Sequence, residues 1–157
     1  MTNPMLSGQG PAAYAERADR PDLTLEGHPK IVPLRVAPQY FLEPRDPDPR
    51  GMPVLGLDGE LAGTVVDVWI DRSEPQIRYL QVGLPRTQAS VLLPIACAKI
   101  SASKRVVAVR AITAAQFVDV PVTAASDLVT RLEEDKIQAY YSAGYLYATP
   151  DRIGPLI

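Results

Sequence analysis

The sequence predicts a mainly β fold: a small β-barrel with an extended arm before it and a short helix after it. Three observations lead to this prediction: sixteen prolines, many of them between residues 4 and 53, about five or six short strand patterns between residues 52 and 112, and one late helical pattern. With 157 residues and 46% hydrophobic content, the chain can bury one core. We therefore expect one domain in three parts, an arm (1–50), a barrel core (51–112) and a C-terminal segment (113–157) with a helix near 131–143.

The proline-rich arm includes the stretches PDLTLEGHPKIVP and EPRDPDPRGMP. Each proline removes a backbone donor and restricts the residue before it, so helix is nearly excluded. The arm also carries more apolar residues than a solvated linker would. We expect it to be extended and to pack on a surface through these residues: Tyr14, Leu23, Leu25, Ile31, Val32, Leu34, Tyr40 and Phe41.

The barrel core begins with PVLGLDGELAG, in which Asp58-Gly59 is a hairpin signal between two short strands. In TVVDVWID, alternation predicts that Val65, Asp67 and Trp69 face inward and that Val66, Val68 and Ile70 lie on the opposite face. Three further strand patterns follow, IRYLQVGL, SVLLPI and RVVAVRAI. This spacing of short strands favours a closed or half-closed β-barrel over an α/β sheet.

The helical pattern TRLEEDKIQAYYSAGYLY opens with a capping box formed by Thr130 and Glu133. Its acids, Glu133, Glu134 and Asp135, are sufficiently explained by the helix dipole, which favours negative charge in the first turns. An apolar stripe at three- and four-residue spacing predicts a buried face and a helix end near Gly144. The stripe consists of Ile137, Tyr140, Tyr141, Gly144 and Tyr145.

Composition excludes several classes of protein. A net charge of -2 and a pI of about 5.4 disfavour a nucleic-acid binder. The single cysteine, Cys97, lies in the apolar run VLLPIACA, which indicates a small buried side chain and a reducing compartment. No apolar run approaches the ~20 residues of a membrane span and the N-terminus resembles no signal peptide, so we expect the chain as given to be soluble.

Motifs for enzyme chemistry are missing: there is no G-x-S-x-G, P-loop, dinucleotide fingerprint or C-x-x-C, and one histidine cannot supply an ordinary zinc site. The stretch WIDRSEPQIRYLQV places two acids, Asp71 and Glu74, beside the turn of a hairpin. They either cap a solvated turn or hold and pass a proton. A hydrolase built on this pair is a further alternative, but nothing in the sequence predicts the concave pocket that it would need.

Three segments carry a resemblance to a known family. GHPKIVPLRVA, GMPVLGLDGELAGTVVDVWIDRSEPQIRYLQV and LEEDKIQAYYSAGYLYATP resemble, in the same order, the cytoplasmic domain of the H subunit of the purple bacterial photosynthetic reaction centre. The similarity runs from about Pro4 to Arg152. It implies a PRC-barrel, a small antiparallel β-barrel with a proline-rich arm and a C-terminal helical segment.

The resemblance implies an accessory subunit of a light-driven electron-transfer complex, not an enzyme. The family's H subunit binds no cofactor itself and caps the L and M subunits, which hold bacteriochlorophyll, bacteriopheophytin, quinones and non-haem iron. It stabilises them and assists electron transfer and proton delivery to the secondary quinone. This implies a location at the cytoplasmic face of the photosynthetic inner (intracytoplasmic) membrane. Membrane contact would come through the partners or through an N-terminal transmembrane anchor, which we expect this sequence as given to lack.

The resemblance also implies roles for individual residues. Family acids at the positions of Asp71 and Glu74 belong to the proton relay, with Glu74 nearer the quinone, and Arg72 and Arg78 would tune their charge. His28 suits the proton entrance because histidine titrates near physiological pH.

The proton entrance departs from the family at two positions. Some members have a histidine at the position of Glu26 and an acid at that of Thr24. We therefore expect Glu26 to accept protons, and any metal site at His28 and Glu26 to be weak.

The alternative within the same fold is a non-photosynthetic PRC-barrel adaptor, structural or RNA-processing, like the barrel of the ribosome maturation factor. The acidic pI and the match outside the barrel disfavour it.

Overall fold

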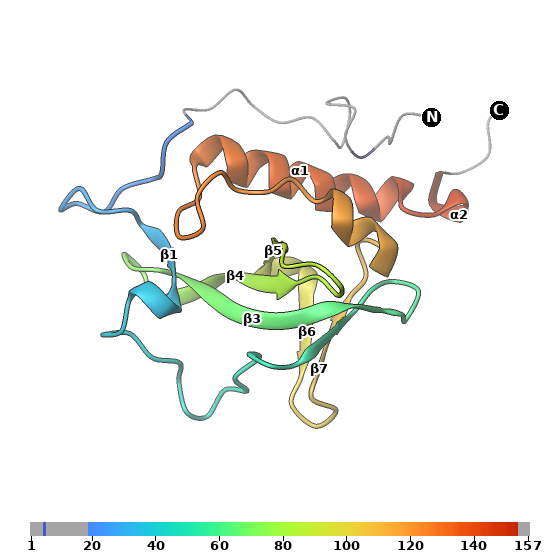
Figure 1. Ribbon diagram of the computed structural model, residues 1–157, viewed down its shortest axis with the longest axis horizontal. Helices are drawn as coiled ribbons and strands as arrows, with labels where there is room; N and C mark the ends of the chain where they lie inside the picture. Colours follow the sequence, from blue (N-terminus) through green and yellow to red (C-terminus); the bar gives the residue numbers. More distant parts are fainter. Residues whose placement is uncertain (1–4, 6–18, 154–157) are drawn as a thin grey trace.

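A single sheet organises the chain. The computed structural model describes residue 5 and residues 19–153, and within them seven strands form a sheet in the order β5-β4-β3-β2-β7-β6, with β1 pairing to β3 beside this path (Figure 1). The strands are β1 (Ile31–Pro33), β2 (Pro53–Leu55), β3 (Leu61–Asp71), β4 (Gln76–Gly83), β5 (Ser90–Pro94), β6 (Ala98–Ser101) and β7 (Val106–Val109). The helical elements include α1 (Arg131–Tyr147), α2 (Pro150–Ile153) and the 3-10 turns η3 (Leu34–Val36), η4 (Ile95–Cys97) and η5 (Ala114–Asp119).

The mainly β prediction is confirmed, although the sheet does not close. Its edges are β5 and β6, and the chain passes from one to the other through the short turn η4. The strand pairs are antiparallel as expected, except that β2 and β7 run parallel. The chain itself, and not a row of hydrogen bonds, therefore joins the two edges of the barrel.

Strand β3 is the centre of the sheet. Its first half alternates as predicted, with Val65 and Asp67 buried and Val66 exposed. In its second half Val68 and Ile70, expected on the opposite face, are buried as well. The strict alternation does not hold because the register of β3 against β4 shifts between Val65 and Asp67 and again between Trp69 and Ile70. At the end of β3 the arm adds to the burial, since Ile70 lies beside arm residues and η3 contacts β3.

The arm is extended, as the prolines predict, and it packs on the sheet. It also adds a strand that the sequence pattern does not indicate, since β1 pairs with β3 in a register that sets Ile31 opposite Asp71. Its apolar residues divide into buried and exposed ones: Ile31, Val32 and Leu34 are in the core, whereas Leu23, Leu25 and Phe41 are exposed. Tyr14 lies outside the described residues, and the division of the chain at residues 50 and 112 stays a prediction.

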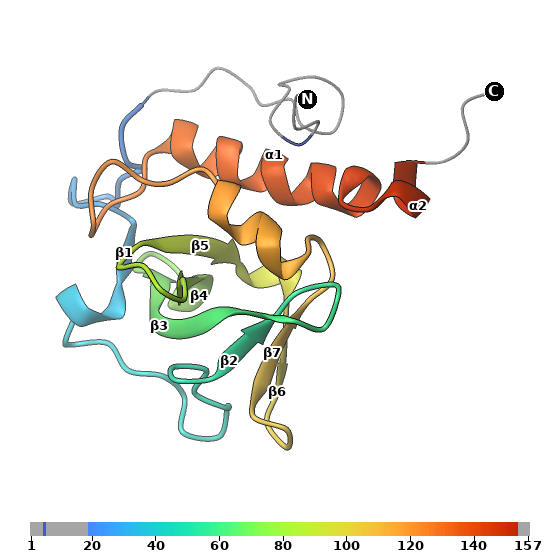
Figure 2. The ribbon, with the colours of Figure 1, turned by 45° about the vertical axis from the view of Figure 1, so that its right-hand side comes forward.

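Helix α1 lies across one side of the sheet (Figure 2). The predicted capping box is present, with the Thr130 side chain accepting from the backbone N–H of Glu133 and the Glu133 side chain accepting from that of Thr130. The predicted stripe is buried at Ile137, Tyr140 and Tyr141, but Tyr145 is exposed. The buried Tyr141 hydroxyl donates to the carbonyl of Leu92 in the edge strand β5, at 3.0 Å. An edge strand has carbonyl groups without a strand partner, and this hydrogen bond satisfies one of them.

The prediction that α1 ends near Gly144 is wrong, because the helix continues to Tyr147. A Cβ atom at Gly144 would lie 2.5 Å from the carbonyl oxygen of Ala111 and 2.5 Å from Cγ2 of Ile112. Glycine is needed here for the close approach of the helix to the segment after β7, and not as a C-terminal cap.

An ion pair at Asp67 ties the arm to the sheet. Arg35 of η3 donates through Nη1 to Oδ2 of the buried Asp67 at 3.0 Å and to Oε1 of Gln81 at 3.0 Å. Its Nη2 donates to the backbone carbonyl of Ser126, just before α1. The other carboxylate oxygen of Asp67 accepts from the backbone N–H of Val68 at 2.8 Å. One arginine thus joins three segments that are far apart in the sequence.

Candidate functional site

Asp71 lies at the end of β3 and is only 1% exposed. Its Oδ1 accepts from the backbone N–H groups of Ser73 and Glu74, at 2.8 and 3.2 Å, so it caps the turn between β3 and β4. Its Oδ2 lies 3.3 Å from Nη1 of Arg78 and 3.8 Å from Nζ of Lys30. Asp71 therefore caps the turn through one oxygen and presents the other to two cations.

The contacts of Arg78 continue from Asp71 to helix α1. Nη2 of Arg78 lies 3.8 Å from Oε1 of Glu134, and the same oxygen accepts the hydroxyl of the buried Tyr79 at 2.7 Å. Burial raises the pKa of Glu134 above its usual value of 4.5, and the Tyr79 hydrogen bond and the charge of Arg78 partly oppose this rise. Burial and the adjacent Glu134 also raise the pKa of Tyr79.

We call these residues the Asp71 cluster: Lys30, Asp71, Arg78, Tyr79 and Glu134. Its Arg78, Tyr79 and Glu134 line an open depression of about 260 Å3 together with Asp22, Arg131, Asp135 and Gln138. The cluster therefore reaches from a buried carboxylate to solvent at the start of α1.

The raised pKa of Glu134 predicts a pH dependence of stability. The folded state favours the protonated carboxyl, so the stabilising contribution is present below pH 4.5 and is lost as pH rises through the folded pKa. We expect Glu134→Gln, which keeps an acceptor for Tyr79, to remove this loss. Urea unfolding of wild type and of Glu134→Gln between pH 4 and 8 measures the free energy of unfolding of each. A difference between them that is independent of pH would contradict the prediction.

Glu74 follows Asp71 in the same turn, but it is exposed. Its backbone N–H donates to Asp71, while its side chain projects from the β3–β4 turn, outside the core. Asp71 and Glu74, which the sequence places beside the same turn, therefore differ in environment: Asp71 is buried and Glu74 is exposed.

The two arginines also differ. Arg78 is ion-paired with Asp71, as expected of a residue that tunes its charge. Arg72 instead donates from Nε and Nη2 to the carbonyl of Pro29, and its backbone N–H donates to the carbonyl of Lys30 at 2.8 Å. Among the described residues it forms no ion pair with Asp71, so the geometry assigns Arg72 to holding the arm against the sheet.

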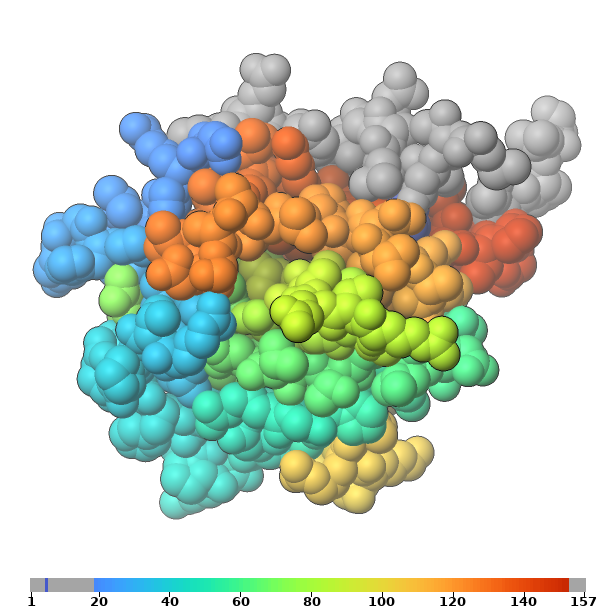
Figure 3. Space-filling model, viewed as in Figure 1, coloured from blue at the N-terminus to red at the C-terminus, as the bar shows by residue number. Residues whose placement is uncertain are grey.

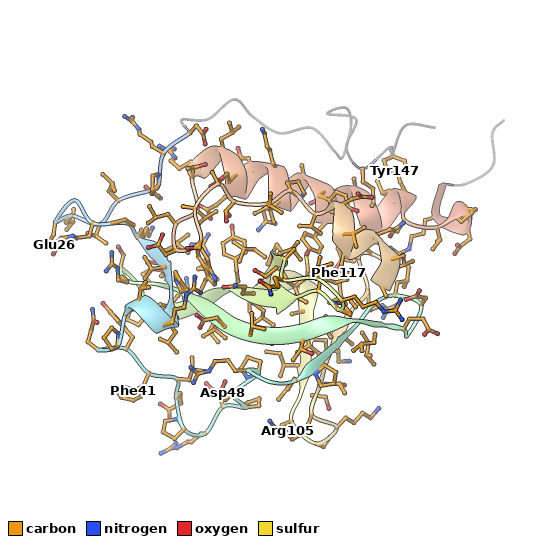
Figure 4. The ribbon with its side chains drawn as sticks, in the orientation of Figure 1. Glu26, Phe41, Asp48, Arg105, Phe117 and Tyr147 are labelled. Carbon is orange, nitrogen blue, oxygen red and sulfur yellow. The ribbon has the colours of Figure 1, made fainter. Side chains whose placement is uncertain are left out.

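Glu26 and His28 lie in a turn of the arm before β1, closed by the hydrogen bond from the Thr24 N–H to the His28 carbonyl at 2.7 Å (Figure 4, in which Glu26 is labelled). Both are exposed. They line an open depression of about 320 Å3 with Thr24, Gln39, Tyr40 and Arg72. The structure therefore brings the two predicted entrance residues together, next to the segment that carries Lys30.

Sequence reasoning missed Lys30, Tyr79 and Glu134 of the Asp71 cluster. Glu134 seemed fully explained by the helix dipole, and no local pattern marks Lys30 or Tyr79. These residues come together only when β1 pairs with β3 and α1 packs on β4, so the linear sequence does not identify them.

The described residues offer neither a metal-binding group nor a helix that could span a membrane. Within them, no group of three histidine, cysteine, aspartate or glutamate side chains is arranged to hold a metal ion. None of the helices among them combines the length and apolar character that crossing a membrane requires.

Two family models match the chain, one at its N-terminal end and one over the sheet. Residues 1–36 match the family model of the N-terminal region of the photosynthetic reaction centre H chain. Residues 43–116 match the model of the PRC-barrel domain, which covers β2 to β7. Together the two matches, in this order, cover most of the chain. The chain belongs to the family of photosynthetic reaction centre H chains and contains their PRC-barrel domain.

Proposed function

We propose that this chain caps the cytoplasmic face of the L and M subunits, stabilises them and passes protons toward the secondary quinone. Its family supports the coarser part: an H chain is an accessory subunit that associates with the reaction-centre core in a photosynthetic membrane, and it is not itself an enzyme. In this proposal the pigments, quinones and non-haem iron are held by the L and M subunits.

The observation that carries the proton-transfer part is the burial of Asp71 among ionisable side chains. A quinone reduced twice takes up two protons, and beneath a protein cap water does not reach it freely. Groups that gain and release protons within hydrogen-bonding reach of one another, or through single waters, can relay them. Asp71 is such a group, whereas Arg78 stays protonated and does not pass protons; its charge instead lies between the carboxylates of Asp71 and Glu134.

The positions suggest an order along the relay. Glu26 and His28, both exposed, take up protons in the depression that they line, and the buried Asp71 receives them. Arg78 and Lys30 stabilise the Asp71 carboxylate between transfers. Glu74, which is exposed in the β3–β4 turn, transfers the proton to the partner subunits.

The test of the whole function uses an L/M core stripped of its H subunit. We expect addition of this chain to restore the rate of the second electron transfer to the quinone. If the chain binds the core but does not restore the rate, it caps the core without relaying protons. If it does not bind, the whole proposal is overturned.

The test of the relay is the Glu74→Gln variant. Because glutamine cannot exchange protons, we expect the second, proton-coupled electron transfer to slow by about tenfold or more while assembly is unchanged. Flash-induced absorbance changes measure the rate of the second electron transfer, and proton uptake is measured on the same complexes. Glu60→Gln, at an exposed glutamate in the β2–β3 turn, is the matched control and should behave as wild type. Normal proton uptake in Glu74→Gln would remove Glu74 from the relay.

A further inference from the structure

An apolar groove lies between the arm and the β3–β4 hairpin, and it shares Tyr40 with the depression at His28. Its volume is about 390 Å3. Apolar side chains from both elements line it, and two acids lie among them. We call it the Phe41 groove, and its main lining residues are Phe41, Glu43, Asp46, Ile70, Ile77 and Ile95.

Phe41 is the clearest sign that this groove is an incomplete surface. The residue is 81% exposed and belongs to the segment after η3. Figure 4 shows its phenyl ring directed away from the sheet. Burying a phenylalanine side chain is favourable by about 1.5 to 3 kcal/mol, so an exposed ring beside an apolar groove favours a partner that covers both. Figure 3 shows this part of the arm on the molecular surface, where a partner can reach it.

The charges at the groove indicate the chemistry of the partner. Glu43 and Asp46 are both exposed, and both line the groove. Of the two nearby arginines, Arg50 is bound to Asp48 at 2.8 Å, and Arg45 is exposed and is not among the residues that line the groove, so the charged groups in its lining are the two acids. Two carboxylates would repel the anionic surface of a membrane and attract a lysine or arginine. The groove therefore fits a protein segment better than a lipid.

The groove also adjoins the proposed relay. Pro75 and Gln76, which directly follow Glu74, line it, and Tyr40 lines both the groove and the depression at His28. A segment seated in the groove would lie against the turn that carries Glu74.

We propose that the Phe41 groove is the docking site for a segment of a reaction-centre core subunit that presents a bulky apolar side chain with a lysine or arginine beside it. The identity of the partner rests on the proposed function. On docking, the partner covers Phe41 and shields the β3–β4 turn from solvent, so the exposed Glu74 comes to lie at the subunit interface.

The experiment measures the affinity of the full chain for the L/M core stripped of its H subunit, for wild type and three variants. We expect Phe41→Ser to weaken binding by about tenfold or more. The double variant Glu43→Gln and Asp46→Asn should weaken it several-fold and reduce its dependence on salt. Val118→Ser, at an exposed apolar residue of η5 outside the groove, is the control and should bind as wild type. Thermal unfolding should be unchanged in all three variants, since the altered side chains are exposed.

The outcomes separate the two proposals. Wild-type affinity for Phe41→Ser would overturn the groove and leave the capping function standing. Failure of wild type to bind the core would overturn both. Binding of wild type to phosphatidylglycerol vesicles that is lost in Phe41→Ser, with core binding intact, would assign the groove to lipid and overturn the protein partner.

Discussion

The Tyr140→Ala variant is expected to lose about 3 to 5 kcal/mol of unfolding free energy, as is typical when an aromatic core side chain is truncated to alanine. Tyr140 is completely buried, and its ring packs edge-on against Tyr141, with centroids 6.0 Å apart. Its hydroxyl donates to the carbonyl of Gln116 in η5, at 2.6 Å. The variant loses the contacts of the buried Tyr140 ring and leaves a partly buried carbonyl without this donor. Chemical denaturation at pH 7 measures the loss.

Tyr140→Phe is the matched control, because it keeps the ring and removes only the hydroxyl. We expect it to cost about 1 kcal/mol, the net contribution of one hydrogen bond. Wild-type stability in Tyr140→Ala would show that α1 is not held on the sheet as described. Equal losses in the two variants would assign the whole effect to the hydrogen bond.

Arg35→Met is expected to cost about 2 to 3 kcal/mol of unfolding free energy, because it leaves the carboxylate of Asp67 buried without its cation. This is at the lower end for a buried pair, since the Arg35 side chain is 42% exposed and water can reach the site. Arg35→Lys should fall between wild type and Arg35→Met, because lysine keeps the charge but cannot contact Asp67, Gln81 and Ser126 at once.

A double-mutant cycle tests the cause of this loss. Asparagine at position 67 can still accept from the backbone N–H of Val68 and carries no charge. We therefore expect Asp67→Asn to recover at least about 1 kcal/mol in the Arg35→Met background, relative to the sum of the single changes. Additive losses, or a loss below about 0.5 kcal/mol in Arg35→Met, would show that the ion pair does not stabilise the fold.

Much of the fold follows from short stretches of sequence. The Asp58-Gly59 turn, the burial of Val65 and Asp67, and the Thr130 capping box are visible within a few residues, and each is present. These features depend on backbone preference and on the period of apolar residues, which local sequence encodes.

The errors in the fold arise where one segment meets another. The alternation in β3 does not predict the burial of Val68 next to the buried Asp67, because the register of β3 against β4 shifts between Val65 and Asp67. Gly144 resembles a helix end in sequence, yet its role is set by its contact with Ala111. Pattern analysis sees neither contact.

The sequence by itself determined a strand-rich barrel, an arm without α-helix, a capped C-terminal helix, and two acids at one turn as candidates for proton transfer. Only the tertiary structure decided that Asp71 is buried and Glu74 exposed, and that Glu134 joins the cluster. The physical reason is that the environment of a carboxyl group depends on which side chains surround it. Lys30 reaches Asp71 through the pairing of β1 with β3, and Arg78 and Tyr79 reach Glu134 through the packing of α1 on β4, so the cluster exists only in the folded chain.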